Sequence, residues 1–178
     1  MRKQIDIPRS IQKRRLTYKM TAELILSNIL DNSIWILFLG ATFLALCNKN
    51  NYIKHGLTFP IIAVTIGMWI IVGLYFINKL IAVDGLTQDE NRKRIIEIVK
   101  NKFPKLAMNG TGQSIIRFKK EIGIFNWGRE ITIIFNKNEF FINYTTFGRY
   151  HIKSPFHALT NYLILARLLR QFSKNNSL

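Results

Sequence analysis

The chain has 178 residues, of which 48% are hydrophobic, and its formal net charge is +16 at pH 7. Its 13 Phe, six Tyr and three Trp residues supply enough apolar surface for a folded core, so the high charge does not indicate disorder. The excess of positive charge favours an anionic partner, either a phospholipid surface or a nucleic acid. A single cysteine, Cys47, excludes an intramolecular disulfide and a cysteine-based zinc site.

The first segment, residues 1–30, begins basic and becomes apolar. Leu16, Met20 and Leu24 recur at helical spacing, which predicts a helix that lies on the membrane surface and leads into a span. The basic cluster that would face anionic lipid headgroups comprises Lys13, Arg14 and Arg15. A nucleic-acid-binding arm is the alternative, and the apolar segments that follow favour lipid.

The next part, residues 31–79, is predicted to form a transmembrane hairpin. Its second arm, residues 57–78, lies in a run of 24 residues without a charged side chain, and about 20 apolar residues span a bilayer core. The first arm, residues 31–48, has 17 uncharged residues between Asp31 and Lys49, which is short for a span. Its place directly before a clear span favours a hairpin. We expect Asp31 to lie at the N-terminal end of the first helix, where an acidic capping residue is stabilising.

The distribution of basic residues predicts the orientation. Seven Lys and Arg residues lie in residues 1–20 and seven in residues 79–105, whereas the hairpin connection holds only Lys49 and Lys54. Basic residues remain on the cytoplasmic side, so we expect both termini in the cytoplasm. The abundance of Ile, Asn, Lys and Phe is typical of an AT-rich bacterial genome. Together with the hairpin, it predicts a multi-pass protein of the bacterial inner membrane.

Residues 87–178 are predicted to form a small cytoplasmic domain. Thr87, with Glu90 three residues later, indicates a capping box at the start of a helix. Three strands with short connections follow, over residues 114–125, 129–136 and 139–147. Ser154 and Pro155 then predict the start of the last helix. The expected fold is α+β in the order α–β–β–β–α, an antiparallel meander sheet covered by helices.

The sequence contains no recognised motif for a metal, a bound phosphate or a catalytic nucleophile. The acidic residues of the strands lie beside basic residues, as in solvated cross-strand pairs. We therefore predict no catalytic residues, no cofactor and no metal, and the sequence disfavours an enzyme.

The corner between the last strand and the last helix contains Arg149, Lys153 and Ser154. Together with the free N–H groups of a helix start, these side chains could bind a phosphate or a lipid headgroup. A capped corner without a ligand is the simpler interpretation.

These observations predict a non-enzymatic inner-membrane protein whose basic cytoplasmic module binds a protein partner or an anionic lipid surface. A regulatory, an assembly or an immunity-type role would each fit. The alternative is a membrane-tethered nucleic-acid-binding or nuclease-related protein, because basic residues of the domain interleave with aromatic ones such as Trp127. The absence of a ribonucleoprotein-type aromatic motif favours the membrane.

Overall fold

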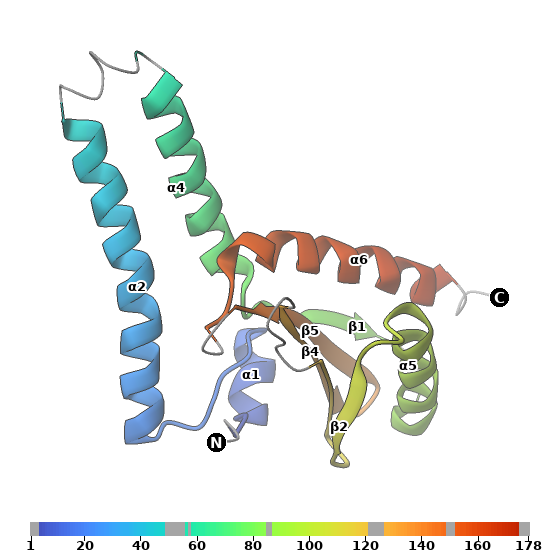
Figure 1. Cartoon of the computed structure of the whole chain (residues 1–178). Coiled ribbons are helices and arrows are strands. Elements are labelled where there is room, and N and C mark those ends of the chain that lie inside the picture. Colours follow the sequence, from blue (N-terminus) through green and yellow to red (C-terminus); the bar gives the residue numbers. More distant parts are fainter. Residues whose placement is uncertain are drawn as a thin grey trace.

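The computed structural model of the chain describes residues 4–48, 56, 58–84, 87–120, 127–148 and 152–174. Its elements are α1 (Ile7–Lys13), α2 (Ala22–Cys47), α4 (Thr58–Phe76), β1 (Ile81–Asp84), α5 (Gln88–Lys102), β2 (Ala107–Thr111), β3 (Ile115–Lys120), β4 (Gly128–Asn136), β5 (Glu139–Phe147), η2 (Pro155–His157) and α6 (Ala158–Lys174). Helices α2 and α4 project from a domain in which helices pack on an antiparallel sheet (Figure 1). The predicted mixture of helices and antiparallel sheet is confirmed.

The sheet has five strands in the order β1-β5-β4-β3-β2, and each neighbouring pair is antiparallel. The expected order α–β–β–β–α is therefore wrong, because β1 and β2 were not among the expected strands. Four-residue β1 is too short to show alternation of polar and apolar residues. Strand β2 contains Asn109 and Gly110, which are poor strand formers, and its pairing with β3 is irregular between Met108 and Thr111.

The main core lies between one face of the sheet and the two helices α5 and α6. Ile116 of β3, Ile133 of β4 and Ile142 of β5 point to this face and are fully buried. Ile95 of α5 and Leu165 of α6 close the core from the other side. Apolar side chains of β4 and β5 alternate between the two faces of the sheet, since Ile134 and Phe141 lie on the opposite face. The predicted capping box is also present, since the backbone N–H of Thr87 donates to Glu90.

The second face of the sheet is covered by the N-terminal segment. Ile5 and Leu16 pack with Leu80, Ile134 and Phe141 in a separate apolar cluster. This segment was expected to lie on a membrane surface as one helix that continued into the first span. Instead, only the seven residues of α1 are helical before the chain turns back along the sheet. The physical reason is that the apolar side chains of the second face require a cover, and burial against the sheet removes them from water.

Helix α2 begins at Ala22, so Asp31 lies within the helix and the expectation that it lies at the N-terminal end is wrong. Residues 22–30 contain neither Gly nor Pro and include strong helix formers, so nothing stops the helix before Asp31. The hydroxyl of Ser33 donates to the carbonyl of Ile29 at 2.7 Å, which satisfies this polar group within the helix itself.

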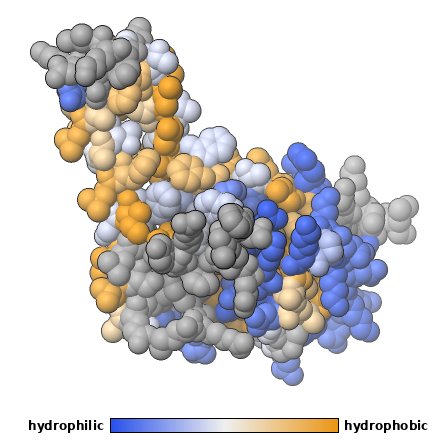
Figure 2. All heavy atoms as spheres, viewed as in Figure 1, coloured by the Kyte–Doolittle hydropathy of each residue, from blue (hydrophilic) through white to orange (hydrophobic). Residues whose placement is uncertain are grey.

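Among the described residues, one helix is long and apolar enough to cross a membrane, namely α4. The apolar part of α2, Ser33–Cys47, is shorter, so length and composition do not confirm a hairpin of two spans. Only 17% of the most apolar window of α4 is buried, whereas the core helix of a soluble domain would be mostly buried. Figure 2 shows hydrophobic residues over the projecting helices and hydrophilic residues gathered on the domain.

Candidate membrane-interface site

The foot of α4 is bonded directly to the sheet. Only four residues, 77–80, separate the end of α4 from β1. The buried side chain of Asn143 in β5 donates its amide N–H groups to the carbonyls of Lys79 at 2.8 Å and of Ile77 at 3.5 Å. Its amide oxygen in turn accepts a hydrogen bond from the Thr145 hydroxyl at 2.6 Å. Asn143 thus binds carbonyl groups of the segment that follows α4, and it connects this segment to a central strand.

The N-terminal segment is bonded to the same place. The backbone N–H of Leu16 donates to the carbonyl of Asn78 at 2.8 Å, and the N–H of Leu80 donates to the carbonyl of Arg14 at 3.0 Å. Arg15 and Lys79 are consequently paired as an isolated antiparallel bridge. Two segments that lie far apart in the sequence therefore meet at the foot of α4.

A group of cations and aromatic rings surrounds this foot, and we call it the collar. Its members are Arg15, Tyr75, Phe76, Lys79 and Tyr162. The ammonium of Lys79 lies 4.9 Å from the centre of the Tyr75 ring, 5.0 Å from that of Phe76 and 5.2 Å from that of Tyr162. The guanidinium of Arg15 lies 5.7 Å from the Tyr75 ring centre. Such contacts stabilise a cation on ring faces, and aromatic and basic residues mark the ends of membrane spans.

The start of the last helix also docks on α4. A Cβ atom at Gly73 would lie 2.1 Å from the carbonyl oxygen of Pro155, so only glycine permits this approach. One turn earlier in α4, the indole N–H of Trp69 donates to the carbonyl of Phe156 at 3.1 Å. The Phe156 ring meets the Trp35 ring of α2 edge-on, with 5.7 Å between their centres. Element η2 is therefore in contact with both projecting helices and holds them against the domain.

Of the residues predicted to face lipid headgroups, Lys13 and Arg14 are exposed and Arg15 lies in the collar. The left-handed conformation of Arg14, with φ of 48°, ends α1 and turns the chain toward the foot of α4. The structure therefore brings Arg15 next to the end of the apolar helix.

The residues predicted to bind an anion are placed differently from one another. The ammonium of Lys153 donates to the Tyr18 hydroxyl at 3.0 Å and to the amide oxygen of Asn78. The buried hydroxyl of Ser154 lies 2.9 Å from Nδ1 of His157. Arg149 lies outside the described residues. Lys153 and Ser154 thus use their polar groups within the protein, and anion binding at this corner stays a prediction.

The titratable side chains near this corner have surroundings that are typical of structural residues. Burial lowers the pKa of His157, and the charge of Arg129 lowers it further. The ring of His157 lies 4.9 Å from the Trp127 ring, centre to centre, and no carboxylate shares these contacts. Burial also raises the pKa of Tyr144, although Arg129 opposes this effect. In the part of the chain that the structure describes, no group of three or more His, Cys, Asp or Glu residues could hold a metal ion.

The predicted cross-strand pairing of acidic residues is confirmed for Glu130. Its carboxylate lies 3.2 Å from the Lys119 ammonium and 3.9 Å from the Arg117 guanidinium. The Thr132 hydroxyl donates to the same carboxylate at 3.3 Å. Glu130 is therefore occupied with neighbouring strand residues on the second face of the sheet.

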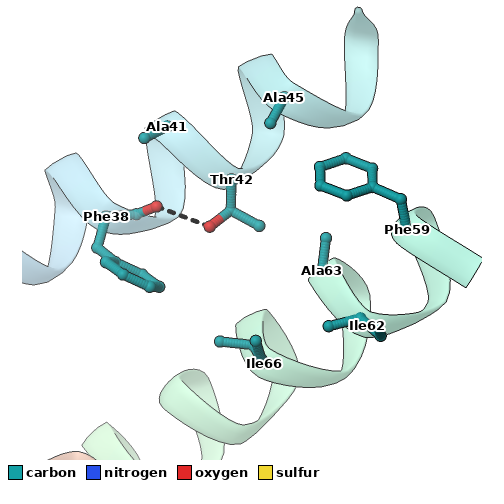
Figure 3. A pocket seen from close by; sticks show the side chains of 8 residues that line it. All are labelled: Phe38, Ala41, Thr42, Ala45, Phe59, Ile62, Ala63 and Ile66. Atoms are coloured by element: carbon teal, nitrogen blue, oxygen red, sulfur yellow. Dashed lines mark hydrogen bonds between the residues drawn. The ribbon is translucent and has the colours of Figure 1, made fainter. Parts of the chain in front are cut away.

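An apolar cleft of about 320 Å³ lies between α2 and α4 (Figure 3). It is lined by Phe38, Ala41, Thr42, Ala45, Phe59, Ile62, Ala63 and Ile66. Its one hydroxyl group, on Thr42, donates to the carbonyl of Phe38 at 2.8 Å within α2. The lining therefore offers hydrocarbon contacts and no free polar group for an ion or a polar substrate.

No protein-family model, curated protein sequence or solved structure matches this chain. The function is therefore inferred from the geometry at the foot of α4. Sequence reasoning missed Asn143 and Gly73, although both have a signal. An Asn inside an alternating strand requires buried partners, and a Gly inside an apolar helix indicates a close approach.

Proposed function

We propose that the protein is a two-pass inner-membrane protein. In this proposal α2 and α4 cross the bilayer, and the basic α+β domain is held against the cytoplasmic surface of the membrane. Its role is binding, and the collar contacts the anionic headgroups of that surface. The observation that carries the proposal is the hydrogen bonding between residues 14–16 and 78–80 at the foot of α4.

This hydrogen bonding constrains the path of the chain. Residues 14–16 and 78–80 are in direct contact, so they lie on the same side of any membrane. If α4 crosses the membrane, the chain between these segments must cross an even number of times. Helix α2 is the other helix that the structure describes in this interval, which supports α2 as the second span.

The dimensions support the same arrangement. The 19 residues of α4 extend over about 28 Å, which is close to the thickness of a bilayer core. The apolar part of α2, Ser33–Cys47, is shorter, and thinning of the bilayer or snorkelling of flanking residues accommodates such a mismatch at modest cost. The collar lies where α4 ends, which is where basic and aromatic side chains meet the headgroup region.

The alternative, a nucleic-acid-binding domain, has less support. One face of the sheet is covered by α5 and α6, and the apolar part of the other is covered by the N-terminal segment. An open sheet on which bases could stack is therefore not available on the main-core face. Arg117 and Lys119 are engaged with Glu130, and Lys153 is engaged with Tyr18.

The single cysteine provides a direct test. Cys47 is exposed at the end of α2 that lies farthest from the domain, so we expect a membrane-impermeant maleimide to label it in spheroplasts. A Cys47→Ser, Asn138→Cys variant moves the thiol to the turn between β4 and β5. We expect this variant to be labelled only after the membrane is permeabilised. Labelling of both thiols from outside, or of neither until permeabilisation, would overturn the proposed topology.

A further inference from the structure

Helix α6 has two faces of different character. Ala158, Leu165 and Leu169 lie on the buried face, which packs on the sheet. On the opposite side, Leu163 is 54% exposed and the neighbouring Ile164 is also exposed. This outer face consists of Phe156 of η2 together with Thr160, Leu163, Ile164, Arg167 and Arg170. A water-soluble domain gains nothing from an exposed stripe of this kind, so its surroundings require an explanation.

The contacts with α4 set the level of this face along the span. Phe156 is bonded to Trp69, and the Tyr162 ring lies 4.8 Å from that of Phe76, centre to centre. Trp69 and Phe76 are separated by about 10 Å along the helix axis. The start of α6 therefore lies at the level of the last two turns of α4, inside the apolar span. Interfacial helices bury their apolar face by about 5–10 Å, which agrees with this level.

The direction of α6 and its charges fit a lipid surface. Figure 1 shows that α6 starts beside the foot of α4 and runs away from it at an angle to the axis of α4. The helix contains no acidic residue, and its basic side chains Arg167 and Arg170 are exposed. The apolar side chains lie nearest α4 and the arginines lie farther away. Long arginine side chains can keep their charge among phosphate groups while their stems lie on apolar surface.

We propose that the outer face of α6 lies in the headgroup region of an anionic bilayer and acts as a second, in-plane anchor beside the spans. This inference rests on the proposed function, because it requires α4 to cross the membrane. It adds a defined lipid-binding surface, with Leu163 and Ile164 in the acyl boundary and Arg167 and Arg170 on the phosphates. Together with the collar, this surface prevents the domain from turning about the axis of α4.

The test uses the full-length protein in nanodiscs that contain phosphatidylglycerol. Single cysteines are introduced on a Cys47→Ser background and labelled with an environment-sensitive fluorophore. Leu163→Cys reports on the outer face of α6, and exposed Ile62→Cys reports on the span. Asn138→Cys is the matched aqueous control, because the nine residues of β5 place its turn about 30 Å from η2.

We expect the label at position 163 to show blue-shifted emission and to be quenched by lipids that carry a nitroxide near the headgroup. The label at 62, about 6 Å inside the far end of α4, should be quenched by nitroxides on the acyl chains near that end, and the label at 138 by neither kind of lipid. If 163 behaves like 138 while 62 lies in lipid, the α6 proposal is overturned and the proposed function stands. If 62 lies in water, both are overturned. Blue-shifted emission at 163 without lipid quenching would identify a protein partner or a second copy, which also overturns the proposal.

Arg167 and Arg170 allow a second, independent test of the proposal. In the Leu163→Cys protein, we expect headgroup quenching to increase with the fraction of phosphatidylglycerol in phosphatidylcholine nanodiscs. Arg167→Glu with Arg170→Glu should abolish this increase. The matched control exchanges two exposed basic residues of α5, Lys93→Glu with Lys100→Glu, and should retain it. Loss of the increase in the control, or its persistence in the α6 variant, would contradict the assignment of these arginines to the lipid phosphates.

Discussion

The sheet and α4 contain the same kind of side chain in opposite surroundings. Ile133 in β4 has no exposed surface, whereas Ile62 and Ile71 in α4 are 53% and 54% exposed. Each exposed aliphatic side chain of this size forgoes about 1.5–3 kcal/mol of transfer free energy if its surroundings are water. In the sheet, helices α5 and α6 pack on one face and remove its apolar side chains from water. Most of α4 has no such cover, and a bilayer would provide one.

Apolar residues are arranged in two different ways in the two regions of this chain. In the sheet, apolar residues alternate with polar ones, so one strand supplies two different faces. In α4, apolar residues occupy every side of the helix, and no charged residue interrupts them. The two regions meet at the collar, where the chain changes from one kind of surroundings to the other within four residues.

The largest effect should come from truncating the same residue type in each region. Ile133→Ala leaves a cavity in the main core, so we expect a loss of about 2–5 kcal/mol in the free energy of unfolding of the domain. Ile62→Ala is the matched control and should change it by less than about 0.5 kcal/mol. Thermal unfolding in nanodiscs measures both. Equal losses would show that α4 is packed like the sheet.

The contact between the regions can be broken at Gly73. A methyl group there would overlap the carbonyl of Pro155, so we expect Gly73→Ala to destabilise the protein by about 1–3 kcal/mol. The matched control is Gly67→Ala, because its methyl group would meet only Leu39 at 3.9 Å. Alanine favours a helix by roughly 0.8–1.0 kcal/mol over glycine, so the control should be neutral or stabilising. Emission of Trp69, one turn away, should shift only in the Gly73 variant.

The hydrogen bonds at the foot of α4 can be removed separately. Asn143→Ala leaves buried carbonyl groups without a donor, and we expect a loss of about 1–3 kcal/mol in the free energy of unfolding. Asn101→Ala, at an exposed position of α5, should have little effect. Amide hydrogen exchange in residues 77–80 should accelerate in the first variant alone. Unchanged exchange there would show that Asn143 does not hold the two regions together.

A substitution in the collar should change the effect of anionic lipid on the unfolding temperature more than it changes the packing of the protein. We expect wild-type protein to unfold at a higher temperature in phosphatidylglycerol nanodiscs than in phosphatidylcholine nanodiscs. Lys79→Met keeps the apolar contacts with Tyr75 and Phe76 but removes the charge, so this difference should shrink. Lys100→Met, on the exposed side of α5, should leave it unchanged. A full lipid-dependent difference in Lys79→Met would exclude the collar as a headgroup contact.

The smallest effect belongs to the capping box of α5, far from the proposed membrane. Hydrogen bonds from Thr87 lower the pKa of Glu90 below its ordinary value. The stabilisation is therefore complete above the pKa that Glu90 has in the unfolded chain, and it is lost as pH falls through the lower folded value. We expect Thr87→Ala to destabilise the protein slightly at neutral pH, and the difference from wild type to shrink in acid. A difference that is independent of pH would contradict this link.

Several parts of this fold are readable from local patterns. The capping box at Thr87, strands β4 and β5 and the long apolar helix were each predicted from a pattern within one stretch of the chain. The last helix was also expected to start at Pro155, and the structure begins there with the short 3-10 turn η2.

Other parts required contacts between distant residues. Strand β1 is four residues long and becomes a strand by pairing with β5. The N-terminal segment resembles an interfacial helix in sequence, yet the second face of the sheet buries Leu16. The ammonium of Lys153 is bonded to Tyr18, which lies in a part of the chain that no local pattern connects to it.

The sequence by itself determined the charge, the long apolar helix and the alternating strands, because these depend on composition and on the period of the backbone. The tertiary structure decided which apolar faces are covered and which segments meet at the foot of α4. Those choices depend on burial and hydrogen bonding between residues such as Asn143 and Lys79, which are 64 positions apart. The direction of α6 also depends on a contact between distant residues, the close approach of Pro155 to Gly73.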